Sequence, residues 1–192
     1  MNLTTTQRLT LHANIVALSA PGQPLEGMPE VENWAGIASY YNAAPVPAVY
    51  CWNPQTPSEA LFDSIDFTQY TPNDATTDAT QTYNNRAQAI LIKQANLQLI
   101  LVGKATVDMS KANIRAALKD ATTSLPSGNS GANRSATGTN GINLLNAGLK
   151  ALNRVEEFFA TTTETTGAVT ASIRVVQGTL TEQNVSDIWN NL

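Results

Sequence analysis

Residues 161–181, TTTETTGAVTASIRVVQGTLT, decide the fold, because their pattern differs from the helical pattern that dominates the rest of the chain. The first six residues are nearly all Thr, which favours extended structure. From residue 169 to residue 176, side chains alternate with a period of two, and the apolar Val169, Ala171, Ile173 and Val175 fall on one face. Gly167 separates the two segments, so the stretch predicts a β-hairpin.

This hairpin needs a partner, because two isolated strands are marginally stable in water. Either it folds back onto the helices of its own chain, or it adds to a sheet of a neighbouring subunit. The Thr-rich arm is too polar for a core, and the free N–H and C=O groups of an exposed strand pair readily with another strand. We therefore expect subunit contacts in this region, with Arg174 exposed to water or paired with an acid. The candidates are Thr161, Thr163, Thr165, Val169, Ile173, Arg174, Val175 and Trp189.

The N-terminal half reads as helices separated by proline-rich segments. Thr4 and Gln7 match a capping box, and a helix with Leu11, Ile15 and Leu18 on one face follows. Residues 30–41 predict a second helix, with Val31, Trp34, Ile37 and Ala38 facing inward. Residues 45–52 contain prolines and predict an extended segment that forms a short edge strand.

Further helices are expected in the second half. The longest runs from Asp74 or Asp78 to residue 102 and is apolar on several faces, which is typical of a central helix. Ser110 is expected to cap the next helix, with Ile114, Ala117, Leu118 and Ala121 inward. Residues 126–141 predict a mobile loop, because they contain no large apolar side chain. A helix then continues to Phe159, and a terminal helix starts near Thr179, which pairs with Glu182 in a capping box.

The fold class predicted from these patterns is mainly α: a helical bundle with a C-terminal β-hairpin and a short terminal helix. We expect a helical core domain over residues 1–160, including the mobile loop 126–141. Residues 161–192 are expected to form an arm made of the β-ribbon and the terminal helix.

Composition points toward packing against other proteins. Charged residues make up only 14% of the 192 residues, whereas an ordinary soluble domain has roughly 25%. The net charge is −4, and the eleven basic residues are scattered, which disfavours unspecific DNA binding. Lys111, Arg115 and Lys119 share one helical face, and we interpret them as a solvated stripe. A weak contact with DNA that passes an assembly is the alternative interpretation.

The sequence offers no residues in a catalytic or metal-binding pattern, and we expect no enzyme activity and no cofactor. The single histidine, His12, lies within the first predicted helix, and the single cysteine, Cys51, lies in an apolar run as a buried thiol. Asp63 with Asp66, and Asp74 with Asp78, stand beside Ser, Thr and Pro, where Asp more often caps a turn. No apolar run is long enough to span a membrane, and the N-terminus does not resemble a signal peptide.

The order of several motifs resembles a family of small proteins encoded among the virion structural genes of tailed bacteriophages. The motifs are LTTTQRLTLHANI near the N-terminus, WAGIASYYNAAPVPAVYCW from residue 34, SKANIRAAL from residue 110, RVEEFFAT from residue 154 and VVQGTLTEQNVSDI from residue 175. Residues 54–78 do not match, and TTTETTGAVTAS replaces the short turn that usually follows the FAT motif. The resemblance implies a structural protein of the virion, assembled in the bacterial cytoplasm, without assigned catalytic residues.

Among virion roles, we favour a head-to-tail connector (adaptor) subunit that forms a homo-oligomeric ring and contacts portal or tail proteins. Connector rings resemble the predicted layout of a helical core with a protruding hairpin or C-terminal arm, and an acidic protein suits a passage for DNA. The alternatives are a tail or baseplate component, a capsid cement protein, or a tail-assembly chaperone that is absent from finished particles.

Overall fold

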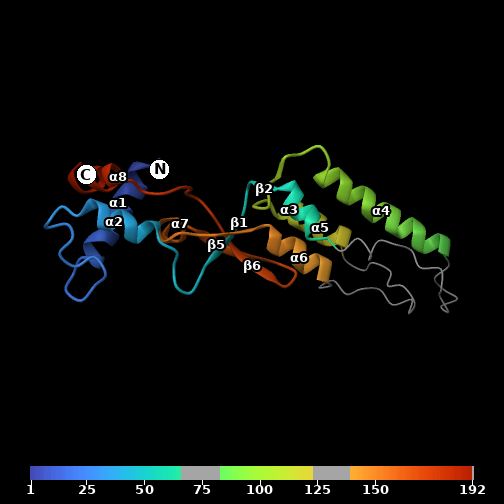
Figure 1. Cartoon of the computed structure of the whole chain (residues 1–192), viewed down its shortest axis with the longest axis horizontal. Coiled ribbons are helices and arrows are strands. Elements are labelled where there is room, and N and C mark those ends of the chain that lie inside the picture. Colours follow the sequence, from blue (N-terminus) through green and yellow to red (C-terminus); the bar gives the residue numbers. More distant parts are fainter. Residues whose placement is uncertain (66–82, 123–138, 192) are drawn as a thin grey trace. The chain divides into compact units, whose positions relative to one another are not determined.

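A computed structural model describes residues 1–65, 83–122 and 139–191 (Figure 1). Within these residues, helices alternate with short strands. The elements are α1 (Thr5–Leu18), α2 (Trp34–Asn42), β1 (Tyr50–Trp52), β2 (Thr56–Pro57), α3 (Ser58–Asp63), α4 (Tyr83–Leu101), β3 (Thr106–Val107), α5 (Ala112–Thr122), α6 (Thr139–Ala147), β4 (Leu149–Ala151), α7 (Arg154–Phe158), β5 (Thr161–Thr166), β6 (Val169–Ile173) and α8 (Glu182–Asn190).

The strands form two sheets. A mixed four-stranded sheet has the order β4-β1-β6-β5, and β2 pairs with β3 in an antiparallel two-stranded sheet with Thr56 opposite Val107. The C-terminal hairpin and the terminal helix are confirmed. The fold class is mixed α/β, which corrects the predicted mainly α helical bundle, because the sequence did not predict the four-stranded sheet. The expectation that residues 45–52 form an edge strand is wrong, because β1 lies between β4 and β6.

The chain divides into two compact units, and neither is a continuous stretch of sequence. Unit 1 consists of Met1–Tyr50, Ala151–Thr162 and Ser172–Leu192, and unit 2 consists of Cys51–Lys150 and Thr163–Ala171. Each strand of the larger sheet contains a point at which the chain passes from one unit to the other. The division into 1–160 and 161–192 that the sequence suggested stays a prediction.

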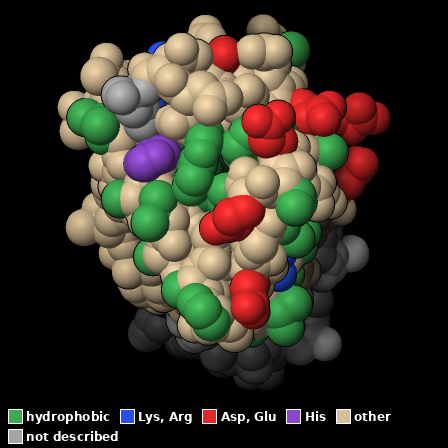
Figure 2. Space-filling view, turned by 90° about the vertical axis from the view of Figure 1, so that its left-hand side faces the viewer, with side chains coloured by type: hydrophobic (Ala, Val, Ile, Leu, Met, Phe, Trp, Pro, Cys, Tyr) green, Lys and Arg blue, Asp and Glu red, His purple; other side chains and the backbone are tan. Residues whose placement is uncertain are grey.

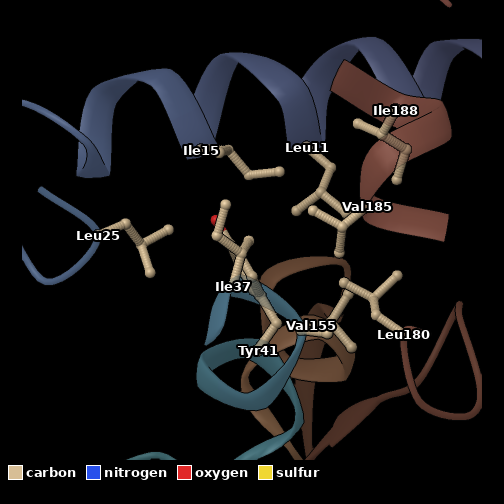
Figure 3. Close-up of a cluster of buried hydrophobic side chains, with 10 residues drawn as sticks. Leu11, Ile15, Leu25, Ile37, Tyr41, Val155, Leu180, Val185 and Ile188 are labelled. Carbon is tan, nitrogen blue, oxygen red and sulfur yellow. The ribbon is translucent and has the colours of Figure 1, made fainter. Parts of the chain in front are cut away.

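The core of unit 1 is formed mainly by α1, α2 and α8 (Figure 3). The expected capping box of Thr4 and Gln7 begins α1 and is confirmed. The box that begins α8 is formed by Thr181 and Asn184, so the predicted box at Thr179 is wrong. The buried apolar side chains of this core are Leu11, Ile15, Leu25, Ile37, Ala38, Tyr41, Val155, Leu180, Val185 and Ile188.

Helix α2 begins later than the sequence predicted. The side chain of Asn33 accepts a hydrogen bond from the N–H of Gly36 and caps the helix, which starts at Trp34. Glu32 has a φ of 53°, a left-handed conformation that cannot belong to the helix. Val31 therefore lies outside α2 and is 74% exposed, which corrects its predicted inward orientation.

In unit 2, helix α4 buries one face. Leu97 and Leu101 are buried, whereas Leu91, Ile92 and Leu99 are exposed, so the prediction of a central helix is wrong for the described side chains. The other buried apolar side chains of this unit include Leu61, Ile65, Val107, Met109, Leu118, Ala121, Leu144 and Leu145. The predicted start of α4 near residue 74 or 78 lies outside the described residues.

The end of α4 and the start of α5 lie on either side of β3. Gly103, just after α4, has a φ of 77°, a left-handed conformation in which helices commonly end. Ser110 does not cap α5, because its hydroxyl donates to Asp108 and α5 begins at Ala112. The expected inward orientation of Ala117 is also wrong, since this residue is exposed.

The single helix that was expected to run to Phe159 is interrupted. Helix α6 ends at Ala147, and a Cβ atom on Gly148 would lie 2.5 Å from Cε of the buried Met109. Strand β4 follows and pairs with β1, and a capping box of Asn153 and Glu156 then begins α7. Helix α6 starts at Thr139, so the predicted loop 126–141 ends too late, and its residues 126–138 lie outside the described part.

Candidate functional site: the β5 edge

The β-hairpin that the sequence predicts around Gly167 is present. Strands β5 and β6 are joined by the two-residue turn of Gly167 and Ala168, in which Gly167 has a φ of 62°. On its other side β6 pairs with β1, and β5 is the last strand of the sheet (Figure 1). Within the described residues, no further strand pairs with the outer side of β5.

The hairpin geometry determines where the main-chain groups of β5 point. Residues that flank a two-residue turn exchange hydrogen bonds across the hairpin, and pairs along the strands then alternate in type. Thr165 therefore belongs to a non-hydrogen-bonded pair, in which side chains lie close together. The Oγ1 atoms of Thr165 and Thr170 are 2.8 Å apart, as this register requires. By the same alternation, the N–H and C=O groups of Thr161, Thr163 and Thr165 point to the outer edge.

The inner face of β5 is held by Arg115 of α5. This side chain is 1% exposed, and its Nη1 donates to the main-chain carbonyls of Met109 at 2.7 Å and Ser110 at 2.8 Å. Its Nε donates to Oγ1 of Thr166 at 3.1 Å, and its Nη2 forms an ion pair with Glu164. Four groups from two parts of the chain thus fix one planar guanidinium, which holds β5 against α5.

Trp52 of β1 completes this anchor. The guanidinium carbon of Arg115 lies 4.6 Å from the centroid of the buried Trp52 ring, so the cation lies over the face of the indole. The indole N–H donates to the main-chain carbonyl of Glu164 at 3.3 Å. The inner side of β5 is therefore bonded through both its main chain and its side chains.

The burial of Arg115 corrects the sequence interpretation of a solvated stripe. Lys111 is exposed and pairs with Asp108 at 3.5 Å, but Arg115, in the middle of the stripe, points into unit 2. Helical spacing alone gave no sign of this difference. The partner Glu164 lies 49 residues away in the sequence, so the ion pair could not be found from local patterns.

The candidate contact residues separate into two groups. Thr161, Thr163 and Thr165 lie together and exposed on β5, whereas Val169 on β6 is buried within unit 2. The predicted alternation does not continue after Ile173, which is half-buried: the following Val175 is exposed. Val176 is buried instead, against the predicted orientation of both valines.

Arg174 and Trp189 have partners within unit 1. Arg174 donates to the carboxylate of Glu156 at 3.1 Å, and both side chains are buried, so the acidic partner expected for Arg174 belongs to its own chain. The ring centroid of Trp189 lies 5.1 Å from that of His12 and 6.1 Å from that of Trp34. These two candidates therefore contribute to the internal packing of unit 1.

A shallow groove of about 470 Å³ runs beside β5. Small exposed residues of α5, Ala112 and Ala116, form part of its lining, with Lys119 among the other lining residues. On the opposite side the lining comes from Glu164 to Gly167. The groove therefore lies between α5 and the C-terminal end of β5.

A second, separate hollow of about 620 Å³ lies in unit 1 and is lined by aromatic and proline side chains. Its only arginine, Arg154, donates to the carbonyl of Tyr40 at 2.9 Å and lies 4.3 Å from the centroid of that ring. Burial, with a smaller contribution from neighbouring Tyr40, raises the pKa of Tyr41 above its ordinary value of 10.0. The hydroxyl of Tyr41 donates to Asn14 at 2.5 Å, so it stays protonated as a structural donor.

The surface of unit 1 is acidic. Figure 2 shows one face of this unit, on which Asp and Glu side chains are prominent and Lys and Arg side chains show only at small spots. Unit 1 contains seven acidic side chains and three basic ones. The acidic residues are Glu26, Glu30, Glu32, Glu156, Glu157, Glu182 and Asp187, and the basic ones are Arg8, Arg154 and Arg174.

The other kinds of site considered are metal centres, a reactive thiol, acidic pairs and membrane-spanning helices. The described residues contain no group of three or more His, Cys, Asp or Glu side chains that could hold a metal ion. Cys51 is buried, as expected, and Asp63 lies in α3, while Asp66, Asp74 and Asp78 lie outside the described residues. Among the helices described, none is long and apolar enough to cross a membrane.

Comparisons of the chain with protein-family models, curated proteins and solved structures find no match.

Proposed function

We propose that this chain is a structural subunit of a tailed-phage virion, a head-to-tail connector (adaptor) that joins its neighbours through the outer edge of β5. The observation that carries the proposal is a six-residue, Thr-rich strand at the end of a sheet. It is held by Arg115, and no other strand among the described residues pairs with its outer edge. Such an edge binds another strand through main-chain hydrogen bonds, which define the register of the contact.

The rigidity of β5 supports this role. A flexible arm would lose conformational entropy when it pairs, whereas β5 is already ordered by the contacts of Arg115 and Trp52. Its exposed side chains are Thr, which favour strands and cost less to desolvate than charged side chains. Both properties lower the free-energy cost of adding a strand at this edge.

The acidic surface of unit 1 supports a position beside DNA, because like charge prevents the duplex from adhering to a passage. The exposed Lys111 and the half-buried Lys119 are the residues of the former stripe that would make a weak contact with packaged DNA. Portal and tail proteins are the partners that this position implies. The resemblance of the motifs supports a virion structural protein, and the choice of the connector among virion roles rests on the C-terminal hairpin and the acidic balance of the chain.

Pro substitution at the outward-facing positions tests the proposal. Thr163→Pro with Thr165→Pro removes two outward N–H donors, and Pro is tolerated on edge strands where the N–H does not bond within the sheet. We expect this double variant to fold, as circular dichroism would show, and to be missing from assembled particles. The matched control Thr163→Ser with Thr165→Ser keeps every main-chain donor and should be incorporated normally.

Particle analysis distinguishes the other virion roles. A ring at the portal vertex supports the connector, icosahedral decoration would identify a cement protein, and a position along the tail would identify a tail component. Absence of the chain from purified particles by mass spectrometry would favour a tail-assembly chaperone. Normal incorporation of the double Pro variant would contradict the role of β5.

A further inference from the structure

We propose that two copies of this chain pair β5 against β5 in an antiparallel arrangement, around a two-fold axis that passes beside Thr163. This inference goes beyond the proposed function, because it concerns the free protein and does not depend on any particle. It rests on the self-complementary sequence of β5, on an outer edge with which no other described strand pairs, and on the small residues of α5 beside it.

The outward-facing positions of β5 complement themselves. Antiparallel pairing centred on Thr163 places Thr163 opposite its own counterpart and Thr161 opposite Thr165 of the second copy. These three pairs each exchange two main-chain hydrogen bonds, and every pair is Thr with Thr, a favourable cross-strand combination. Residues 161–165 of β5 overlap in this register, and Thr166 lies opposite Ala160, which precedes the strand.

The position of Glu164 selects this register over its neighbour. With the axis beside Thr163, Glu164 lies opposite Thr162 of the second copy, which is uncharged. A shift of two residues would place Glu164 directly opposite Glu164, and like charges in that position destabilise a sheet. Each Glu164 also keeps its ion pair with Arg115 of its own chain, which reduces the remaining repulsion.

Part of the surface next to β5 is lined by small residues. Neighbouring strands lie about 4.8 Å apart, and a groove of about 470 Å³ lies between α5 and residues 164–167. On the α5 side the exposed lining residues Ala112 and Ala116 are small, so no bulky side chain from these positions blocks the approach. A two-fold contact joins subunits in pairs, so a ring would need a second contact of another kind.

Cysteine cross-linking tests the pairing and its register in the purified full-length protein. The Cα atoms of a hydrogen-bonded antiparallel pair are about 5.5 Å apart, within the range of disulfides. We expect Thr163→Cys to give a disulfide-linked dimer under mild oxidation. Thr161→Cys alone should not, because the two copies of residue 161 would be four residues out of register, roughly 14 Å apart along the strand.

A double variant, Thr161→Cys with Thr165→Cys, should cross-link, because these positions face each other in the two copies. The wild type gives the background, since its only thiol, Cys51, is buried. Absence of dimers for both Thr163→Cys and the double variant overturns the proposal. Cross-linking of Thr161→Cys as efficient as that of Thr163→Cys overturns it too, because the contact would then lack a register.

Sedimentation without cysteines gives an independent readout. We expect the wild type to self-associate as its concentration rises, the double Pro variant to remain monomeric and the double Ser variant to behave as wild type. A wild type that is monomeric at every concentration overturns the pairing. Because particles are not involved, that result would leave a strand of another virion protein as the partner in the proposed function.

Discussion

Arg115 and Glu164 form an ion pair across 49 residues of sequence, and this contact connects α5 to the outer strand of the sheet. The arginine is 1% exposed, whereas the Glu164 side chain is 41% exposed. The guanidinium of Arg115 is therefore shielded from water, whereas the carboxylate of Glu164 is partly hydrated. Its other bonds, to two carbonyls and a hydroxyl, use three of the four remaining N–H donors of the guanidinium.

Replacing Arg115 with Met should destabilise the protein strongly. The change leaves the carbonyls of Met109 and Ser110 without their donor and removes the partner of Glu164. Breaking a buried pair from one side costs about 3–5 kcal/mol, and we expect the lower end because Glu164 can be hydrated. Urea unfolding measures the change in the free energy of unfolding.

The matched control is Lys111→Ala on the same helix. Lys111 forms an exposed ion pair with Asp108, and such pairs contribute about 0–1 kcal/mol. If both substitutions destabilised the protein to the same small extent, the anchoring role of Arg115 would be wrong.

Local features could be predicted from the sequence, whereas contacts between distant segments could not. The capping box of Thr4 and the hairpin around Gly167 were predictable, because their determinants lie within a few residues of one another. The burial of Arg115 was not, because it depends on Trp52 and Glu164, which are distant in sequence. The direction in which the N–H and C=O groups of β5 point follows from the length of the turn. The sequence did not define that length, because it did not show where the two strands end.

Arg174 and Glu156 should be coupled energetically. The two buried side chains are 3.1 Å apart, and Glu156 also accepts from the N–H of Gly178 at 3.0 Å. Arg174→Met leaves a buried carboxylate without its cation, at a cost of about 3–5 kcal/mol. In a double-mutant cycle with Glu156→Gln, the loss in the double variant should be smaller than the sum of the single losses by about 1–3 kcal/mol. Additive losses would show that the pair is not coupled.

Tyr41 should contribute to the loss of stability in alkali. Its burial raises its pKa above 10.0, so the folded state favours the protonated phenol. The stabilisation is fully present below pH 10 and is lost as the pH rises above it, because the unfolded chain then releases the proton more readily. At neutral pH, Tyr41→Phe should cost about 1 kcal/mol through the bond to Asn14.

The difference in the free energy of unfolding between wild type and Tyr41→Phe is the quantity to measure at pH 7 and at pH 11. It should shrink or change sign at the higher pH, because the variant has no phenol at this position to ionise. The remaining tyrosines are common to both proteins and cancel in the comparison. An unchanged difference would show that the buried phenol does not contribute.

The break between α6 and α7 also marks a limit of sequence patterns. Apolar residues recur at helical spacing through residue 159, so periodicity favoured one continuous helix. The structure ends α6 at Ala147, and the next residue, Gly148, lies close to a buried side chain of another segment, a contact that a sequence pattern does not contain.

Gly148→Ala should therefore destabilise unit 2. A Cβ atom at this position would lie 2.5 Å from Cε and 2.9 Å from Cγ of Met109, which is fully buried and has no free space to move into. Overpacking of this kind costs about 1–3 kcal/mol, and the carbonyl of Leu145, 3.2 Å away, limits movement of the backbone.

Met109→Ala alone should cost about 2–5 kcal/mol through the cavity that it leaves. In the double variant the new methyl group occupies part of that cavity, so the total loss in the free energy of unfolding should fall below the sum of the two single losses. A fully additive result would mean that Met109 does not exclude larger residues at position 148.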